Sequence, residues 1–261
     1  MSEFDYRNLA PVPDQDMSPP DGYGTGLVVR DYSVYPVGYN AKAFDIPIIP
    51  VDKRQAALDA LVASKAQLHN IRDRSGPNGA PIPSRDQGSR GYCWSHSTVS
   101  AMLLARAVQG EPYADLSAYA IACIIKNYRD EGGWGSASLE WAAEHGCPTS
   151  EFWPQQSVSR SNDNAAMREN AKKHRVTEWM DLQPRNKEQL ITCLLLNIPV
   201  VSDFNWWGHS VCTVALLSLN PFRTLIWNSW GDRWQQNGMG VLEGSKAIPD
   251  GMIAPRVLMG G

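Results

Sequence analysis

Apolar residues at helical spacing dominate the middle of the chain. Between Pro50 and Asn70 they recur every three or four positions, which predicts an amphipathic helix of about four turns. Residues 93–109 contain neither glycine nor proline and place their apolar side chains on one face, so we predict the clearest helix there, with Gly110 as its stop. Shorter helices, each opened by a residue of the N-cap type, are predicted at Ser117–Ile125, Ser136–His145 and Asn186–Asn197.

The last part of the chain has a different pattern. Short runs rich in β-branched residues predict strands at 198–204, 210–217, 224–228 and 239–243. Helices thus come first and strands follow, which favours an α+β fold with a helical half packed on a sheet half. A groove between two such halves is a natural ligand site.

Residues 1–50 show neither periodicity and are rich in proline and tyrosine. We interpret them as an extended N-terminal arm, followed by the amphipathic helix and a link at 51–69 and by a globular domain at 70–261. A disordered terminus is the alternative interpretation of the same composition.

Composition excludes several classes of partner. The 24 basic and 27 acidic residues are spread evenly, so the chain lacks the clustered basic charge of nucleic-acid binders and has no electrostatic attraction to anionic membranes. No apolar run approaches the roughly 20 residues of a membrane span, and no signal peptide is visible at the N-terminus. We therefore expect a protein of the cytoplasm, or of an assembly made there.

The five cysteines are scattered and form no Cys-x-x-Cys pair. Their number and spacing indicate free thiols, without a disulfide scaffold or a zinc site, so we expect no metal and no other cofactor.

Three residues suggest a nucleophilic site. A glycine-rich turn delivers Cys93 to the first position of the predicted long helix, where free amides and the helix dipole stabilise a thiolate. Taken alone, such a cysteine is more often a small buried hydrophobe. However, His209 begins one predicted strand and Asn228 ends the next, and adjacent antiparallel strands would bring them together as a base and the group that orients it.

At this point four motifs, in order, resemble those of papain-like (cathepsin-type) cysteine peptidases. The run from Asp86 to Ser95 resembles the family's nucleophile segment, and Glu131-Gly132-Gly133-Trp134 resembles its substrate-binding glycine pair. The other two motifs are Trp153-Pro154 and Asn228-Ser229-Trp230-Gly231. The resemblance covers about residues 70–255 and implies a papain-like two-lobed fold, with the nucleophile on the helical lobe and the His and Asn on an antiparallel sheet lobe.

The resemblance also implies roles for individual residues. Cys93 would attack as a thiolate beside protonated His209, which would then protonate the departing amine. Asn228 would orient the imidazole, and Trp230 would shield that hydrogen bond from water. Gln87 would donate, with the Cys93 amide, to the oxyanion.

Three neighbouring residues would bind substrate on the same resemblance. Gly133, beside Gly132, would pair with an extended substrate backbone, because a side chain there would block close approach. Trp134 would line the neighbouring specificity pocket.

Several positions depart from the family pattern. Arg90 and Asp130 stand where the family commonly has two bridged cysteines, and we predict that an ion pair spans the same gap. Cys123 also lacks the cysteine that is often its partner, which points to a reducing compartment. Tyr92 replaces a small residue before the nucleophile, where it would narrow the cleft or supply a hydroxyl.

We therefore predict a cysteine endopeptidase that hydrolyses polypeptides through a Cys-His-Asn acyl-enzyme mechanism. The alternative is a papain-like structural or peptide-binding component of a larger assembly, and a related acyl transfer is a third reading. Residues 1–68, which include the arm, are either a short pro-region that crosses the groove or a tether that packs on a partner protein.

Overall fold

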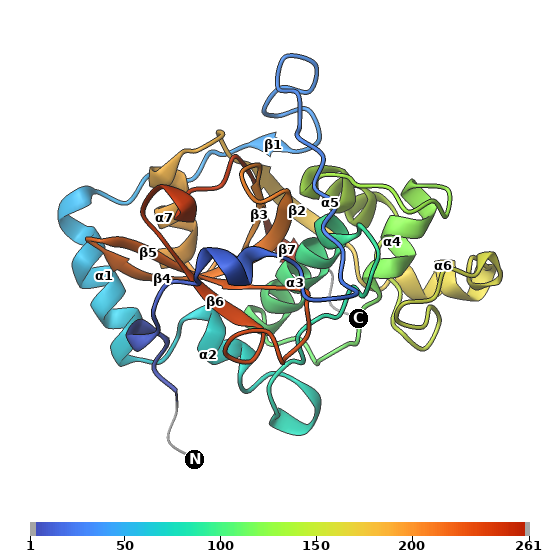
Figure 1. The fold of residues 1–261 in the computed structure, drawn as a ribbon, viewed down its shortest axis with the longest axis horizontal. Helices are drawn as coiled ribbons and strands as arrows, with labels where there is room; N and C mark the ends of the chain where they lie inside the picture. Colours follow the sequence, from blue (N-terminus) through green and yellow to red (C-terminus); the bar gives the residue numbers. More distant parts are fainter. Residues whose placement is uncertain (1–3, 259–261) are drawn as a thin grey trace.

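The computed structural model describes residues 4–258, and the ends of the predicted arm (1–3) and of the predicted domain (259–261) lie outside it. Helices gather on one side of the molecule and most of the sheet on the other, with α3 (Cys93–Val108) between them (Figure 1). Every residue of α3 from Cys93 to Arg106 is buried, so this helix is the centre of the core. The α+β two-lobed fold expected from the pattern is confirmed.

The helical half surrounds α3. It comprises α4 (Ala118–Ile125), α5 (Gly135–Glu144) and α6 (Ala165–Ala171). Three further helices, α1 (Val51–Ala63), α2 (Leu68–Arg72) and α7 (Lys187–Leu195), lie toward the sheet, and short 3-10 turns occur at Tyr6–Asn8, Asp14–Met17, Pro77–Gly79, Arg160–Asn162 and Gly244–Ala247. Within residues 4–258, no helix has both the length and the apolar character needed to span a membrane.

The described strands form one sheet in the order β1-β2-β7-β3-β4-β5-β6. The strands are β1 (Lys42–Ala43), β2 (Val176–Asp181), β3 (Val200–Phe204), β4 (His209–Leu219), β5 (Phe222–Trp227), β6 (Met239–Glu243) and β7 (Gly251–Leu258). The pairing of β1 with β2 is parallel, and all the other pairings are antiparallel. The four predicted strands are confirmed, whereas β1, β2 and β7 were not predicted.

Two predicted helices differ in detail. The helix expected between Pro50 and Asn70 is broken after Ala63, where Lys65 adopts a positive φ of 51° and α2 then starts at Leu68. The helix expected from Ser136 starts instead at Gly135, and the Ser136 hydroxyl donates to Asn40 Oδ1 of the arm. Ser136, which the local sequence pattern predicts as a helix cap, thus uses its hydroxyl to bind the arm.

The arm is ordered along both halves. Val12 donates its backbone N–H to Val241 O at 2.9 Å on the edge of the sheet, and Met17 is buried in the cluster that contains Trp230 and Trp234. The arm then crosses the front of the molecule toward α5 (Figure 1). Whether residues 70–261 form a separate domain stays a prediction, because Val12, Met17 and Leu58 of the preceding segments share that core cluster.

A chain of buried hydrogen bonds joins the two halves. The hydroxyls of Ser97 on α3 and Ser210 on β4 are 2.7 Å apart, and Ser210 Oγ donates to Asp203 Oδ1 on β3 at 2.6 Å. Asp203 Oδ2 accepts the backbone N–H of Gly135, the first residue of α5, at 3.2 Å. Ser210 is therefore the link between the helix that carries Cys93 and the strand that carries His209.

We predict that Ser210→Ala lowers the free energy of unfolding by about 1–3 kcal/mol, because Ser97 and Asp203 each lose a buried partner. Denaturant unfolding followed by circular dichroism measures the change. Ser218→Ala, at a half-buried position farther along β4, is the matched control and should change stability by less than about 0.5 kcal/mol. Equal effects of the two substitutions would contradict the linking role.

Candidate active site

Cys93 is the first residue of α3, directly after the glycine-rich turn, as predicted. Its side chain is completely buried. Burial raises the pKa of the thiol to about 12, and a backbone hydrogen bond from Ser210 opposes this rise. The thiol in this closed arrangement is therefore protonated at neutral pH.

His209 and Asn228 are brought together by the antiparallel pairing of β4 and β5. His209 Nε2 lies 2.8 Å from Asn228 Oδ1. The same oxygen also accepts the backbone N–H of Ser229 at 2.7 Å, so Nε2 must carry the hydrogen of this contact. Nδ1 of His209 is then the nitrogen with a free lone pair, and it has no hydrogen-bond partner among the described residues.

Two tryptophans surround the imidazole. The ring of Trp230 stacks on His209 with a centroid distance of 4.6 Å, and Trp207 contacts its edge at 4.8 Å. Burial lowers the pKa of His209 to about 4, and the hydrogen bond with Asn228 opposes this change. The imidazole is therefore neutral in the closed arrangement.

Gln87 lies beside this cluster and is fully buried. Its Oε1 accepts from Ser229 Oγ at 2.6 Å, which fixes the amide with its Nε2 group pointing the other way. Nε2 donates to the carbonyl oxygens of Arg90 at 2.8 Å and of Gly24, in the arm, at 3.0 Å.

The predicted substrate-binding glycines lie on the opposite side, before α5. A Cβ on Gly133 would lie 2.7 Å from the ring of Trp94, and one on Gly132 would lie 2.4 Å from the carbonyl oxygen of Gly26 in the arm. Trp134, next in the chain, packs against Tyr35 of the arm at 5.3 Å between ring centroids.

Arm residues 23–28, which we call the central arm segment, lie between the two halves at this place. Gly133 donates its N–H to Gly26 O, and Val28 donates to Gly133 O, both at 2.9 Å. Leu27 thereby forms a parallel bridge with Gly133, and its own N–H donates to Gly208 O, next to His209, at 3.1 Å. The central arm segment thus contacts the predicted substrate-binding residues, and its Leu27 packs against the buried cluster that contains Cys93.

Sequence reasoning left the role of this segment open between a pro-region and a tether. The signal was present in the alternating glycines of Gly22-Tyr23-Gly24-Thr25-Gly26. A Cβ on Gly26 would lie 2.2 Å from Gly91 O, so only glycine permits this approach. Asp203 was also missed, because a single carboxylate inside a predicted strand gives no motif.

Two of the positions that depart from the family pattern, Arg90 and Tyr92, make defined contacts. Arg90 Nη1 lies 3.6 Å from Asp130 Oδ2, so the predicted ion pair is confirmed. Tyr92 is fully buried and its hydroxyl donates to Arg129 O, so its side chain neither narrows a groove nor presents a hydroxyl there. The five cysteines are all buried and free.

Comparison with known proteins decides the family. The model of the papain family of cysteine proteases matches residues 69–217, more than half of the chain. The chain belongs to the papain family of cysteine proteases. The match includes Cys93 and His209 and ends before Asn228.

Relatives and solved structures agree with this papain-family assignment. The chain is 24% identical over 183 residues to Zingipain-1 of Zingiber officinale, covering 61% of this chain and 81% of the relative. It is 26% identical over 181 residues to papain of Carica papaya, covering 61% of this chain and 51% of that protein.

At the level of fold, the cysteine protease xylellain of Xylella fastidiosa superposes with a TM-score of 0.63 at 17% identity, covering 90% of this chain and 96% of that one. The digestive procathepsin L2 proteinase of the Tenebrio molitor larval midgut gives a TM-score of 0.65 at 17% identity, covering 94% and 81%.

We predict that Gly26→Ala exposes Cys93. The added methyl group would collide with the backbone of Gly91, and the φ of 152° at Gly26 disfavours any side chain. Such overpacking destabilises a contact by roughly 1–3 kcal/mol, so the rate of thiol alkylation by iodoacetamide at pH 7 should rise at least about fivefold.

Gly22→Ala is the matched control, because Gly22 also has a positive φ of 84° but nothing lies within 4 Å of the added carbon. Mass spectrometry of the peptide that contains Cys93 gives the rate, and circular dichroism checks that both variants are folded. Equal alkylation rates would mean that the central arm segment does not protect the thiol.

Proposed function

We propose that this papain-family protease is an endopeptidase that hydrolyses polypeptides by acyl-enzyme chemistry at Cys93. The Cys93 sulfur attacks the peptide carbonyl carbon, and His209 transfers the thiol proton to the departing amine. Water then attacks the thioester carbonyl carbon, gives a proton through His209 to the sulfur, and releases the acid.

The observation that carries the proposal is the fixed tautomer of His209. Because Asn228 Oδ1 also accepts from the Ser229 amide, it holds the hydrogen on Nε2 and leaves the Nδ1 lone pair as a base. The Cys93 thiol accepts a backbone hydrogen bond from Ser210, the next residue after His209. The thiol therefore lies close to the strand position that carries the base.

Gln87 supports the same chemistry. Its amide nitrogen donates to a peptide carbonyl oxygen, that of Gly24, beside the start of α3. A donor that holds a neutral carbonyl in the closed chain is suited to hold the negative oxygen of a tetrahedral intermediate. The substrate carbonyl would take the place of the arm.

The arm is, in this proposal, a pro-region. It fills the positions that substrate needs, and by excluding water it keeps both the thiol and the imidazole neutral. Its withdrawal would rehydrate the pair and favour the thiolate–imidazolium form that attacks carbonyl carbons.

The second candidate, a peptide-binding component with little proteolysis, is favoured by the same observation that the arm fills the site. In that case the bound arm is the functional state, and Cys93 has no chemical role. The labelling experiment below separates the two.

We predict that an epoxide or vinyl-sulfone probe labels Cys93 in the Gly26→Ala chain and that unfolded casein is cleaved. Both signals should disappear in Gly26→Ala/Cys93→Ser, whereas Gly26→Ala/Cys212→Ser, which removes another buried free thiol, should keep them. A folded Gly26→Ala chain that neither labels nor cleaves would support the peptide-binding alternative.

We also predict that Gln87→Ala, made in the same background, lowers kcat by about 100- to 1000-fold, the usual loss for one oxyanion donor. KM should change little, because the interaction strengthens only as the negative charge develops. Initial rates on a fluorogenic peptide measure both constants, and a change confined to KM would contradict the role.

A further inference from the structure

Two carboxylates, Asp181 and Asp203, lie on the same face of the sheet beside the predicted substrate-binding loop. Asp181 on β2 is opposite Ile253 on β7, which is opposite Val201 on β3. Asp203 lies two residues beyond Val201, and directly opposite residues of antiparallel strands share a face, so both carboxylates point to the same side.

That side is covered by the start of α5. A Cβ on Gly135 would lie 2.3 Å from Val201 Cγ1, and the Gly135 N–H donates to Asp203. Gly135 is only two residues after Gly133, whose backbone pairs with the central arm segment. The carboxylates therefore adjoin the place where a substrate backbone would pair.

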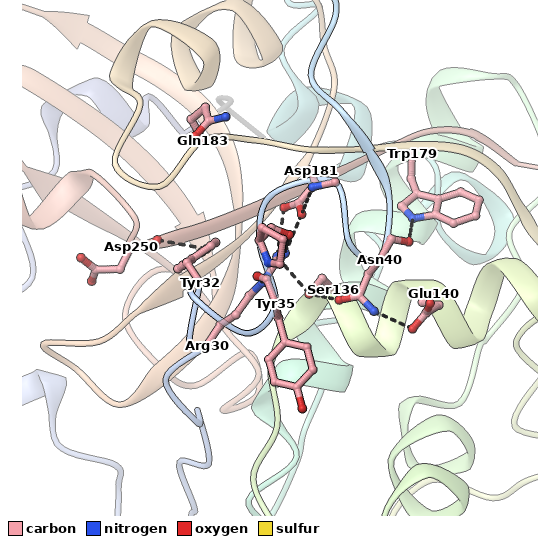
Figure 2. Close-up of polar contacts among 12 residues, drawn as sticks. Arg30, Tyr32, Tyr35, Asn40, Ser136, Glu140, Trp179, Asp181, Gln183 and Asp250 are labelled. Carbon is pink, nitrogen blue, oxygen red and sulfur yellow. Dashed lines mark hydrogen bonds and ion pairs between the residues drawn. The ribbon is translucent and has the colours of Figure 1, made fainter.

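A guanidinium from the arm fills this place (Figure 2). Arg30 Nη1 and Nη2 donate to the two oxygens of Asp181 at 3.1 and 2.8 Å, and Nη1 also reaches Ser136 Oγ at 3.4 Å. The Asp181 side chain is fully buried and that of Arg30 is 6% exposed. The third described donor to Asp181, the N–H of Gly38, also belongs to the arm.

Asp203 is near enough for the charge of the same guanidinium to act on it, and no described hydrogen bond joins the two side chains. Burial raises the pKa of Asp203 to about 6, and the nearby Arg30 charge and the hydrogen bonds from Ser210 and Gly135 lower it. Tyr32 of the arm lies over the Arg30 guanidinium at 4.7 Å, and its oxygen is 3.1 Å from the position of a Cβ on Gly251. Asp181, Asp203 and Ser136 form what we call the acidic site.

If the arm leaves, the acidic site loses its cation. Among residues 4–258, every described hydrogen bond to the Asp181 carboxylate comes from the arm, so withdrawal would leave two carboxylates with no positive partner. A cation that enters the open acidic site would regain the charge-assisted bidentate contact that Arg30 makes with Asp181.

We propose that the acidic site is a specificity subsite that takes an arginine side chain of a polypeptide substrate, and that Arg30 occupies it in the closed chain. This deepens the proposed function and rests on it. Arginine fits better than lysine, because its planar fork matches the bidentate contact that Arg30 makes with Asp181. Leu27 pairs with Gly133 and Arg30 follows three residues later, so the subsite is within reach of a substrate paired with the same glycine.

The first test measures cation binding without any peptidase activity. Arg30→Ala in the full chain should lower the Tm, and N-acetyl-arginine amide at millimolar concentration should restore part of the loss. N-acetyl-citrulline amide, which is nearly the same shape but neutral, should not. If Arg30→Ala does not fold, Arg30→Gln retains a long side chain and is tested in the same way.

The control for this rescue is Arg30→Ala/Asp181→Asn, which should show no difference between the two amides. Rescue of the Tm by both amides alike, or by neither, in the Arg30→Ala chain would overturn the proposal. The Arg30–Asp181 ion pair would then only hold the arm on the sheet.

The second test measures specificity. In a Gly26→Ala/Arg30→Ala chain, peptidyl vinyl sulfones that differ only in the residue three positions from the one that pairs with Gly133, on the side away from the sulfone, should label Cys93 at least about tenfold faster with arginine than with citrulline. Asp203→Asn in this background should reduce the preference. Asp250→Asn is the matched control, because that carboxylate pairs with Arg185 outside the acidic site.

The outcomes separate the two proposals. Equal labelling by the arginine and citrulline probes would overturn the subsite and leave the peptidase intact. Absence of labelling by every probe would count against the peptidase, and the amide rescue then decides whether the acidic site binds a guanidinium.

Discussion

The closed arrangement of the arm depends on a close contact between two glycine backbones. Gly26 of the arm and Gly133 of the helical half share a hydrogen bond at 2.9 Å, and neither position has room for a side chain. Because neither position carries a side chain, the arm backbone approaches closely beside Cys93 and His209, which are both fully buried. The neutral state of both residues follows from that burial.

The pKa changes of Cys93 and His209 are opposite in sign, but both favour the neutral form. Burial favours the neutral thiol at Cys93 and the neutral imidazole at His209, so a proton that would cross from sulfur to nitrogen in an open site stays on the sulfur. The hydrogen bond that His209 Nε2 donates to Asn228 Oδ1 remains in place and already fixes the ring. The closed chain thus already orients the imidazole, and in the proposed mechanism a change to polar surroundings would charge the pair.

Local patterns were sufficient for part of this picture. The glycine-rich turn and the helix behind it placed Cys93, and two consecutive strands placed Asn228 beside His209, because such neighbours in sequence pair in space. In contrast, β7 contains Pro255 and a glycine start, which hide its strand pattern, and β1 is only two residues long. The contact of Arg30 with Asp181 joins residues 151 positions apart, from an arm with no periodicity, so nothing local could predict it.

The predicted substrate-binding loop is held in place partly by the arm, which connects the position of the arm with the shape of the site. The papain family commonly has a disulfide at the place where this chain has Arg90 and Asp130. Arg90 Nη1 lies 3.6 Å from Asp130 Oδ2, and the two side chains are 34% and 44% exposed. Such a pair contributes at most about 1 kcal/mol, against about 2–4 kcal/mol for a disulfide. The Asp130 carboxylate also accepts the Gly91 N–H at 2.8 Å, which holds one end of the loop. The other end, at Gly133, is held by two hydrogen bonds to the arm, so the arm helps to shape the loop. In the proposed function, a substrate that replaces the arm would supply the same backbone contacts.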